Sequence, residues 1–510
     1  MGMVNQKRIA KNTLLLYLRM GVIMLINLYA SRVVLATLGE TDYGLYNVIG
    51  GIVVMFSFLN SVMNAACGRY YAMELGREDY SALHKVFSVN VIIFLVLSLI
   101  ILVLAETVGL WFLECKMVIP ADRMAAARWV YQISIVSFIA SMLAIPFRSI
   151  ITAKEKMKVY AYCSVVEASL KLGAVLLLAT APFDRLVFYA LLMLTVTIGT
   201  SLFYALYCRH FYGECKGRLE WDKPLAKEIV GFNGWGIIGS MATIGKNQGV
   251  NILLNMFYGP VVNAARGVAN QVYVNVFEFL HNYVMAFNPQ IVKSYAAGER
   301  NDMMKLVFQA SKFSYYLLFV IILPLLLELG QVLDIWLVDI PEHAYAFTAI
   351  LLVSALADAM HDPLYYAIQA TGHVKWLNIL VGGAQLMIVV VSYIVLKLTS
   401  VEPELIFWFI FAFTIVAQII RIFLTKHYLG MSIREYARKV LLPTALVTVL
   451  APWLPCLVVR FMPATFLRLC ITVTVSIIAV AILIYTVGLN SSERDGIRKF
   501  LHKKKDGDTQ

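Results

Sequence analysis

The sequence predicts an all-α, polytopic membrane protein with about 14 transmembrane helices, forming two pseudo-symmetric six-helix lobes and two additional C-terminal helices. Three observations lead to this fold class: the composition, a series of long apolar runs, and an internal repeat. The chain has 510 residues, of which 60% are hydrophobic and 15% are charged. Its mean hydropathy is +0.76. A soluble domain carries about 25% charged residues, so the composition excludes an ordinary soluble protein.

The apolar runs are long enough for membrane helices, each of which needs about 20 residues to cross a bilayer. A membrane β-barrel would instead show alternating strands of about ten residues, and the sequence has no such series. The first run is too long for a cleaved signal peptide, which predicts a retained first helix. The expected spans are residues 11–37, 44–67, 86–110, 124–147, 159–181, 184–208, 230–256, 262–289, 307–333, 344–370, 374–397, 403–426, 437–459 and 464–487.

The Lys and Arg residues predict how the chain is oriented. If the N-terminus is cytoplasmic, most of the 43 Lys and Arg residues fall on the cytoplasmic side. They cluster at residues 148–158, 209–227, 293–312, 421–439 and 494–505. The corner "GETDYG" (39–44) and the loop 334–342 have none and are expected outside. This asymmetry predicts that both termini are cytoplasmic. It explains the net charge of +12 without a nucleic-acid partner, and we expect the basic tail to lie on anionic membrane lipids.

The internal repeat predicts two parallel lobes. "PFRSIITAKEKMKVY" (146–160) aligns without gaps with "PLYYAIQATGHVKWL" (363–377), the corner at Gly39 aligns with Gly259, and "ELGRED" (74–79) aligns with "AAGERN" (296–301). The separation is about 220 residues each time, or six spans, and an even number returns the chain to the same side. The expected domains are an N-terminal lobe (1–208), a cytoplasmic linker (209–229), a C-terminal lobe (230–430), two additional helices (431–489) and a basic cytoplasmic tail (490–510). In the linker, Asp222 before Pro224 is expected to cap a short helix.

Four cations inside the expected spans are candidate substrate ligands: Arg19, Arg32, Lys246 and Arg266. A charged residue at the centre of a span costs about 2.5–3.5 kcal/mol on insertion scales, so it is a functional hypothesis by default. For Arg32, near the outer end of its span, the alternative is an interfacial anchor. A cavity lined by cations suits an anion, and a diphosphate matches arginine forks and a lysine point charge.

Polar side chains recur on one face of two spans of the second lobe. We expect Asn247, Asn251 and Asn270 to contribute to substrate binding, because a polar face of a membrane helix must look at water or protein. The alternative is that these amides form hydrogen bonds between helices.

The acidic residues inside spans have different expected roles. Glu167 and Lys171 are spaced i, i+4 with the acid first, which predicts a structural ion pair. Glu278 and Asp358 are candidate coupling groups that would titrate during transport.

The sequence offers no sign of enzymatic chemistry. The seven cysteines form no CxxC and are expected to pack as small apolar residues, so no metal site is predicted. No HExxH, no P-loop and no DxD among the spans is present, and no catalytic residue is expected. A polysaccharide polymerase or glycosyltransferase is therefore a weaker alternative.

The first hairpin, "RVVLATLGETDYGLYNVIGGI", resembles that of the polysaccharide flippases, which move lipid-linked oligosaccharide repeat units. The shared pattern is an arginine followed by L-G-x-x-x-Y-G-x-Y, here Arg32, Leu38, Gly39, Tyr43, Gly44 and Tyr46. These proteins belong to the multidrug/oligosaccharidyl-lipid/polysaccharide exporter (MOP, MATE-like) superfamily. The second lobe has Gly259-Pro260 at the matching corner and lacks the full pattern.

The resemblance implies transport of polyprenyl-diphosphate-linked oligosaccharides across the bacterial inner membrane by alternating access, for O-antigen of lipopolysaccharide, capsule or exopolysaccharide. A peptidoglycan precursor also stays open as the substrate. The implied partners are this lipid-linked oligosaccharide, membrane lipids, and the polysaccharide polymerase and glycosyltransferases of the same biosynthesis. No cofactor is expected, and the coupling ion, H+ or Na+, stays open. The alternative function is a cation-coupled multidrug exporter of the same fold, which would need a buried carboxylate in the first lobe.

Overall fold

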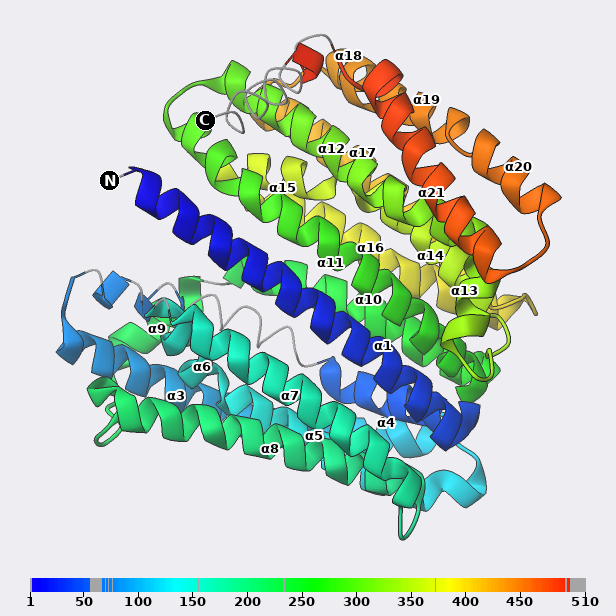
Figure 1. Cartoon of the computed structure of the whole chain (residues 1–510). Helices are drawn as coiled ribbons and strands as arrows, with labels where there is room; N and C mark the ends of the chain where they lie inside the picture. Colours follow the sequence, from blue (N-terminus) through cyan, green and yellow to red (C-terminus); the bar gives the residue numbers. More distant parts are fainter. Residues whose placement is uncertain are drawn as a thin grey trace. The chain divides into compact units, whose positions relative to one another are not determined.

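A computed structural model describes the chain at residues 2–55, 67–68, 70–71, 73–75, 77–154, 156–232, 234–371, 373–490 and 493–495. Within helices, it describes no side chain at residues 2–20, 22, 157–158, 161, 231–238, 240, 281–282, 285–290, 292–293 and 296. The described part contains helices and loops and no strand, which confirms the all-α prediction (Figure 1). The second half of the expected span 44–67 and most of the basic tail lie outside the described residues.

The helices follow the expected spans closely. In the first part of the chain they are α1 (Gly2–Val54), α3 (Tyr80–Leu104), α4 (Leu110–Cys115), α5 (Met124–Leu143), α6 (Ile145–Ala153), α7 (Met157–Leu177), α8 (Arg185–Phe211), α9 (Lys223–Phe232), α10 (Gly234–Tyr258) and α11 (Pro260–Ala296). The later helices are α12 (Arg300–Leu327), α13 (Leu329–Trp336), α14 (Ala344–Asp358), α15 (His361–Ala370), α16 (Val374–Leu398), α17 (Glu404–Leu429), α18 (Ile433–Tyr436), α19 (Leu442–Leu450), α20 (Trp453–Phe461) and α21 (Phe466–Leu483).

Eleven helical stretches of the described chain are long and apolar enough to cross a membrane. One of these stretches, Ile23–Val54, runs through the predicted corner 39–44. α10 and α11 are not among the eleven, but they stand at the expected spans 230–256 and 262–289. The chain is therefore a multi-pass membrane protein, while the count of fourteen spans stays a prediction.

The predicted repeat reappears in the helix boundaries. α1 is broken at Gly39, which has φ 77° and ψ 171°, and α10 and α11 are separated by Gly259, which has φ 84°. Glycine adopts such positive φ values without a side-chain clash, which explains its use at both corners. The short helices α6 and α15 also stand at equivalent positions, each just before a long helix, α7 or α16.

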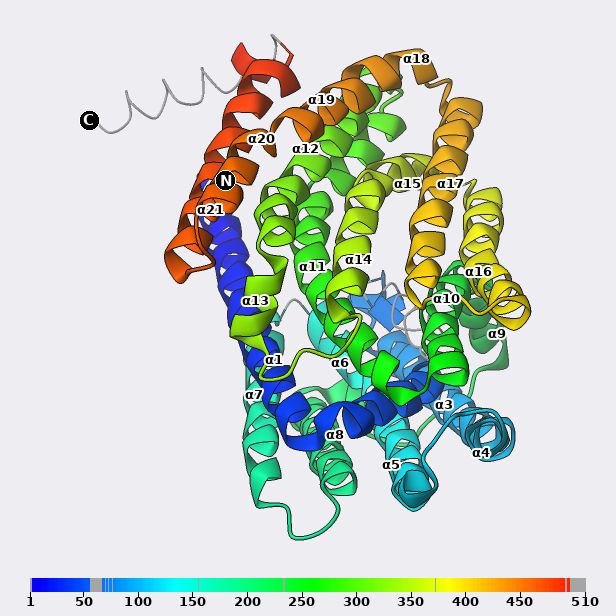
Figure 2. The same cartoon turned by 90° about the vertical axis from the view of Figure 1, so that its right-hand side faces the viewer.

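The described chain divides into two compact units, and each is described by itself. Unit one comprises residues 1–268, 336–344 and 386–403, and unit two comprises residues 269–335, 345–385 and 404–510. In unit one, α5 packs against α1, α3 and α8, and α7 packs against α1 and α8. In unit two, α12 packs against α15 and α21, and α20 packs against α21 (Figure 2).

The linker after α8 packs against unit one through hydrogen bonds and an ion pair. As predicted, Asp222 caps its short helix: Asp222 Oδ1 accepts a hydrogen bond of 3.0 Å from the Leu225 N–H, and α9 begins at Lys223. The buried Glu214 carboxylate pairs with Lys154 at the end of α6. His84 of α3 also reaches the linker, because its Nδ1 lies 2.8 Å from the carbonyl oxygen of Glu214.

Candidate functional site

The two corner turns of the repeat meet inside unit one. The helix that follows Gly39 crosses the start of α11 so closely that a Cβ on Gly44 would lie 1.8 Å from the Pro260 carbonyl oxygen. A Cβ on Gly267 would lie 2.8 Å from Asn47 Nδ2. Only a residue without a side chain fits at such a crossing. The second glycine of the hairpin pattern, Gly44, is therefore explained by helix packing rather than by a turn.

Three asparagines hold this crossing together. Asn251 Nδ2 donates to the Asn47 carbonyl oxygen at 3.2 Å. Asn263 Nδ2 donates to both the backbone oxygen and Oδ1 of Asn251, each at 2.7 Å. Asn251 is 3% exposed, so in this conformation its amide serves contacts between helices, which is the alternative left open for the polar face.

The same polar face also holds a loop. Asn255, one helical turn after Asn251, accepts a 2.9 Å hydrogen bond from the Val118 N–H through its Oδ1. Asn255 is fully buried. The side chains of α10 thus join the second half of α1, the start of α11 and the loop after α4.

Arg266 is the predicted cation whose surroundings are best defined. Its Nη2 donates to the Asn247 carbonyl oxygen at 2.6 Å, and its side chain is half-buried. Among the described residues, no carboxylate lies within ion-pair distance of Arg266. Lys246, also half-buried, precedes Asn247 on α10. The structure thus brings Arg266 to the Asn247 backbone on α10, next to Lys246 in the sequence.

The other predicted ligands are placed less closely. Arg32 is half-buried in α1, before the break at Gly39. Asn270 lies on the exposed side of α11 and belongs to unit two. Arg19 lies in α1, and its side chain is outside the described part.

The predicted ion pair of the first lobe is present, since Lys171 Nζ lies 2.7 Å from Glu167 Oε1. A second carboxylate was missed. Glu106 is half-buried in a π-helical turn, Ala105–Gly109, and accepts a 3.1 Å hydrogen bond from Gln132. Its position in the predicted span 86–110 was the available signal.

A guanidinium that the sequence did not single out, that of Arg123, lies before α5 and joins α1 to the residue before α8. Arg123 donates from Nε to Asp42 at 2.8 Å and from Nη1 to Asp184 at 2.6 Å. Asp42, which lies in α1 after the break at Gly39, thus pairs with Arg123. Asp184 caps α8 through the Val187 N–H at 3.1 Å. Burial favours a higher pKa for Asp184, but the hydrogen bonds from Arg123 and Val187 outweigh it and lower the pKa below its usual value.

In unit two, the predicted coupling group Asp358 has a cationic partner. Arg421 Nη1 donates to Asp358 Oδ1 at 3.1 Å, and the Arg421 side chain is 1% exposed. Arg421, expected in a cytoplasmic basic cluster, is buried, and α17 continues past it to Leu429. Lys312, expected in another cytoplasmic basic cluster, forms a buried pair with Glu493 at 2.5 Å. Glu278, the other coupling candidate, lies on the exposed side of α11.

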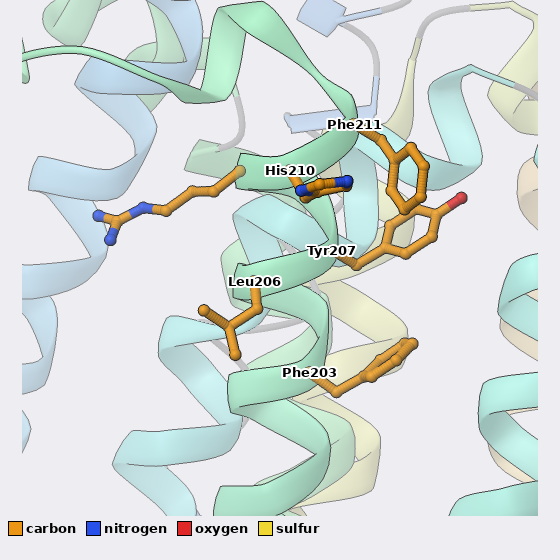
Figure 3. Close-up of a pocket in the computed structure, with 6 residues that line it drawn as sticks. Phe203, Leu206, Tyr207, His210 and Phe211 are labelled. Atoms are coloured by element: carbon orange, nitrogen blue, oxygen red, sulfur yellow. The ribbon is translucent and has the colours of Figure 1, made fainter.

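A shallow pocket lies away from these groups, at the C-terminal end of α8 (Figure 3). It is lined by Phe203, Leu206, Tyr207, Arg209, His210 and Phe211. Neighbouring rings on one side of the helix contact each other, with centroids 4.6 Å apart for Tyr207 and Phe211. Aromatic and basic residues at a span end are typical of the membrane–water interface. We therefore interpret this surface as a lipid-facing helix end.

Solved structures with similar folds are membrane transporters. A multidrug resistance MATE family transporter of the MOP superfamily, in an inward-facing conformation, is 14% identical with a TM-score of 0.62 over 80% of this chain and 94% of that chain. The lipid II flippase MurJ, in an inward closed conformation, is 11% identical with a TM-score of 0.69 over 92% of this chain and 98% of that chain. A MOP superfamily transporter from Pyrococcus furiosus is 15% identical with a TM-score of 0.57 over 82% and 96%.

At these identities the likeness shows the fold alone, and it confirms the predicted fold class. No curated protein matches the chain. The family described as "Polysaccharide biosynthesis protein" matches residues 9–295, which include the first hairpin, both corners and the polar face of α10. The chain therefore belongs to the polysaccharide biosynthesis protein family and has the fold of the MOP superfamily.

Proposed function

We propose that the protein is a flippase that moves polyprenyl-diphosphate-linked oligosaccharides from the cytoplasmic to the outer leaflet of a bacterial inner membrane. The observation that carries the proposal is Arg266. A half-buried arginine in α11, which stands at the expected span 262–289, with no carboxylate partner among the described residues, is a costly feature that an anionic substrate would compensate. The family match, which concerns polysaccharide biosynthesis, supports a glycan-bearing substrate.

The chemistry of the substrate agrees with these residues. A diphosphate carries several negative charges and many acceptor oxygens, which suit the forked donors of Arg266 and the ammonium of Lys246. The Arg266 guanidinium uses one donor on the Asn247 carbonyl oxygen, and its fork has five N–H donors in all. Arg19 and Arg32 are proposed as further contacts earlier and later in transit. No covalent step is required.

The contact between the two corners supports alternating access. If the corner 39–44 is outside, as the Lys and Arg distribution predicts, then the Gly44–Pro260 crossing closes the outer side of unit one. Transport would open this crossing and release the Asn47–Asn251–Asn263 hydrogen bonds. Asn251 and Asn247 would then become available to the glycan. Asn251 is thus proposed to act in both conformations.

One observation favours the alternative, a cation-coupled multidrug exporter. Glu106 is a half-buried carboxylate within a first-lobe membrane helix, and the solved relatives include a multidrug resistance transporter. The Gln132 amide donates a hydrogen bond to this carboxylate. The exporter predicts that organic cations, rather than diphosphates, move across the membrane.

The test is transport of a polyprenyl-diphosphate oligosaccharide in proteoliposomes. We expect wild type to move it, Arg266→Ala and Lys246→Ala to lose at least about tenfold in rate, and Arg266→Lys to recover part, because charge returns without the fork. The matched control is Arg128→Ala, which removes an exposed arginine paired with Glu114. Rates of the Ala variants equal to wild type would remove Arg266 from the site. Export of organic cations, lost in Glu106→Gln, with no lipid-linked sugar moved, would establish the exporter instead.

A further inference from the structure

The membrane span of residues 344–370 in unit two is interrupted at a group of charged residues. α14 ends at Asp358 and α15 begins at His361, although the whole stretch is one candidate span. Backbone groups freed by such a break are tolerated at membrane depth where protein or a polar cavity satisfies them. Interrupted helices of this kind commonly hold coupling ions in transporters.

The first lobe contains the same break without the charges. There α5 ends at Leu143 and α6 begins at Ile145, again within one candidate span. In the repeat alignment, Pro146 matches Pro363, so Ser141, Ala144 and Ile145 match Asp358, His361 and Asp362. The Ser141 hydroxyl donates to its own helix, and Ala144 and Ile145 are buried. In the first lobe the break therefore forms without charged residues at these positions, so the break by itself does not explain those of the second lobe.

The imidazole of His361 lies between two carboxylates. Its Nδ1 is 3.6 Å from Asp362 Oδ1 and 3.9 Å from Asp358 Oδ1. Arg421 holds Asp358 from α17, and the nearest ring is Tyr365, with centroids 5.7 Å apart. Tyr273 of α11 interacts electrostatically with both carboxylates. On its other side, α15 packs its Leu364 against apolar residues of α12: Met303, Val307 and Phe308.

Two buried donors at this cluster have hydrogen-bonding capacity left. Arg421 Nε and Gln418 Nε2 are buried and donate to no acceptor among the described residues. Gln418 Oε1 accepts from Arg421 Nη1 at 3.3 Å, so the amide and the guanidinium belong to one network with Asp358. A network with unused donors can rearrange when its charge changes.

The sum of charge on four of these side chains changes with one proton. With His361 neutral, Asp358, Asp362 and Arg421 together carry one negative charge, and a proton on the imidazole brings the sum of these four side chains to zero. Arg421 at 3.1 Å from Asp358 disfavours a metal cation, whereas a proton on Nδ1 faces both carboxylates directly. Histidine is also the side chain that ordinarily changes charge between pH 5 and 8.

We infer that Asp358, His361 and Asp362 form a proton-binding site, and that proton binding there is coupled to the movement of the transported lipid. The coupling rests on the proposed flippase function, whereas the proton site does not. A proton on His361 offsets the negative charge of the two carboxylates and so lowers the cost of moving these side chains into a less hydrated environment during a conformational change. Proton binding therefore biases the conformations between which the protein alternates.

The decisive variant restores the residues of the first lobe: Asp358→Ser, His361→Ala and Asp362→Ile together. In proteoliposomes, one coupled proton changes the wild-type distribution of substrate about tenfold for each unit of pH difference across the membrane. We expect the triple variant to keep downhill movement and to lose this response. The control Asp302→Asn removes an exposed acid paired with Lys305 and should respond like wild type. A triple variant that responds like wild type, or a wild type indifferent to the pH gradient, would overturn the coupling.

A second measurement decides the proton site whether or not lipid-linked sugars are transported. Histidine labelled with 15N is followed by NMR in nanodiscs, and the His361 signal is assigned by its loss in His361→Gln. We expect its titration midpoint to move by about one pH unit or more toward acid in Asp358→Ser with Asp362→Ile, because the carboxylates that favour the charged ring are gone. An unchanged midpoint would refute the site. A moved midpoint with no lipid-linked sugar transported by wild type would refute the flippase and keep the site.

Discussion

Gly44 decides how closely the two corners approach each other. The Pro260 carbonyl oxygen stands 1.8 Å from where its Cβ would be, whereas a Cβ on Gly50 would meet nothing within 4 Å. Both glycines belong to α1 and follow the break at Gly39. They therefore form a matched pair for substitution: an added Cβ would clash with backbone at Gly44 and would meet open space at Gly50.

Gly44→Ala is expected to lower the stability of the protein by about 1–3 kcal/mol, because backbone atoms must move apart. Gly50→Ala is expected to be neutral or slightly stabilising, since alanine limits the unfolded chain more than glycine does. Thermal unfolding of the two purified variants in detergent measures the difference. Equal midpoints would show that the corners are not packed in this way.

The Arg123 cluster makes stability depend on acidity. The pKa of Asp184 is lowered in the folded protein, so its carboxylate stabilises the fold above its unfolded pKa of about 3.9. This contribution is lost as pH falls through the lowered folded value. Between pH 6 and 3, the thermal midpoint of wild type should therefore fall more steeply than that of Asp184→Asn. The control is Asp339→Asn, an exposed loop acid, and parallel curves for wild type and Asp184→Asn would contradict the assignment.

At the scale of elements, two buried ion pairs join α12 to the C-terminal region. One lies near the start of α21 and the other lies beyond the end of α21. The fully buried Glu328 accepts 2.7 Å and 2.8 Å hydrogen bonds from Arg468 and Thr472 at one end. At the other end, Lys312 reaches Glu493 beyond α21. The C-terminal helices are thus an integral part of unit two.

Arg468→Met is expected to destabilise the protein by about 3–5 kcal/mol, because it leaves the Glu328 carboxylate buried without its cation. The double variant with Arg468→Met and Glu328→Gln should recover much of this lost stability, because the buried side chain at position 328 is then uncharged. Lys305→Met, which breaks an exposed pair, should change the unfolding midpoint far less than Arg468→Met does. A double-mutant cycle on unfolding midpoints makes the comparison, and additive effects of Arg468→Met and Glu328→Gln would exclude the coupling.

At the scale of the whole molecule, the orientation in the membrane can be measured directly. The exposed Cys115 is predicted to lie outside, and a cysteine at the exposed linker position Glu220 to lie inside. A membrane-impermeant thiol reagent on intact spheroplasts should label Cys115. In a background with Cys115→Ser, Cys456→Ser and Cys470→Ser, it should label Glu220→Cys only after permeabilisation. The opposite pattern would invert the topology.

Alternating access predicts that the corner crossing opens in each cycle. Asn47 Cγ lies 3.3 Å from where a Gly267 Cβ would be, so the two Cβ atoms of Asn47→Cys and Gly267→Cys lie within about 5 Å, a distance that a disulfide can bridge. Oxidation should stop transport in the double variant and reductant should restore it, while Asn47→Cys alone stays active under both conditions. A crosslinked protein that transports at the wild-type rate would show that this crossing does not open.

Local features of the sequence determined much of this structure. The apolar runs and composition predicted a multi-pass helical protein, and the repeat placed equivalent corners at Gly39 and Gly259, which share a positive φ. The Asp222 cap and the Glu167–Lys171 pair also formed as expected. Each depends on residues a few positions apart, or on periodicities that survive in any tertiary context.

Only the tertiary structure decided which polar groups face each other across the chain. Asn251 forms hydrogen bonds with Asn47 and Asn263, and Arg421, expected in a cytoplasmic basic cluster, is buried and pairs with Asp358. Hydropathy shows that a polar residue lies in a membrane and that it needs a partner. The partner is set by how helices cross, through contacts between residues far apart in sequence, and no local pattern encodes that geometry.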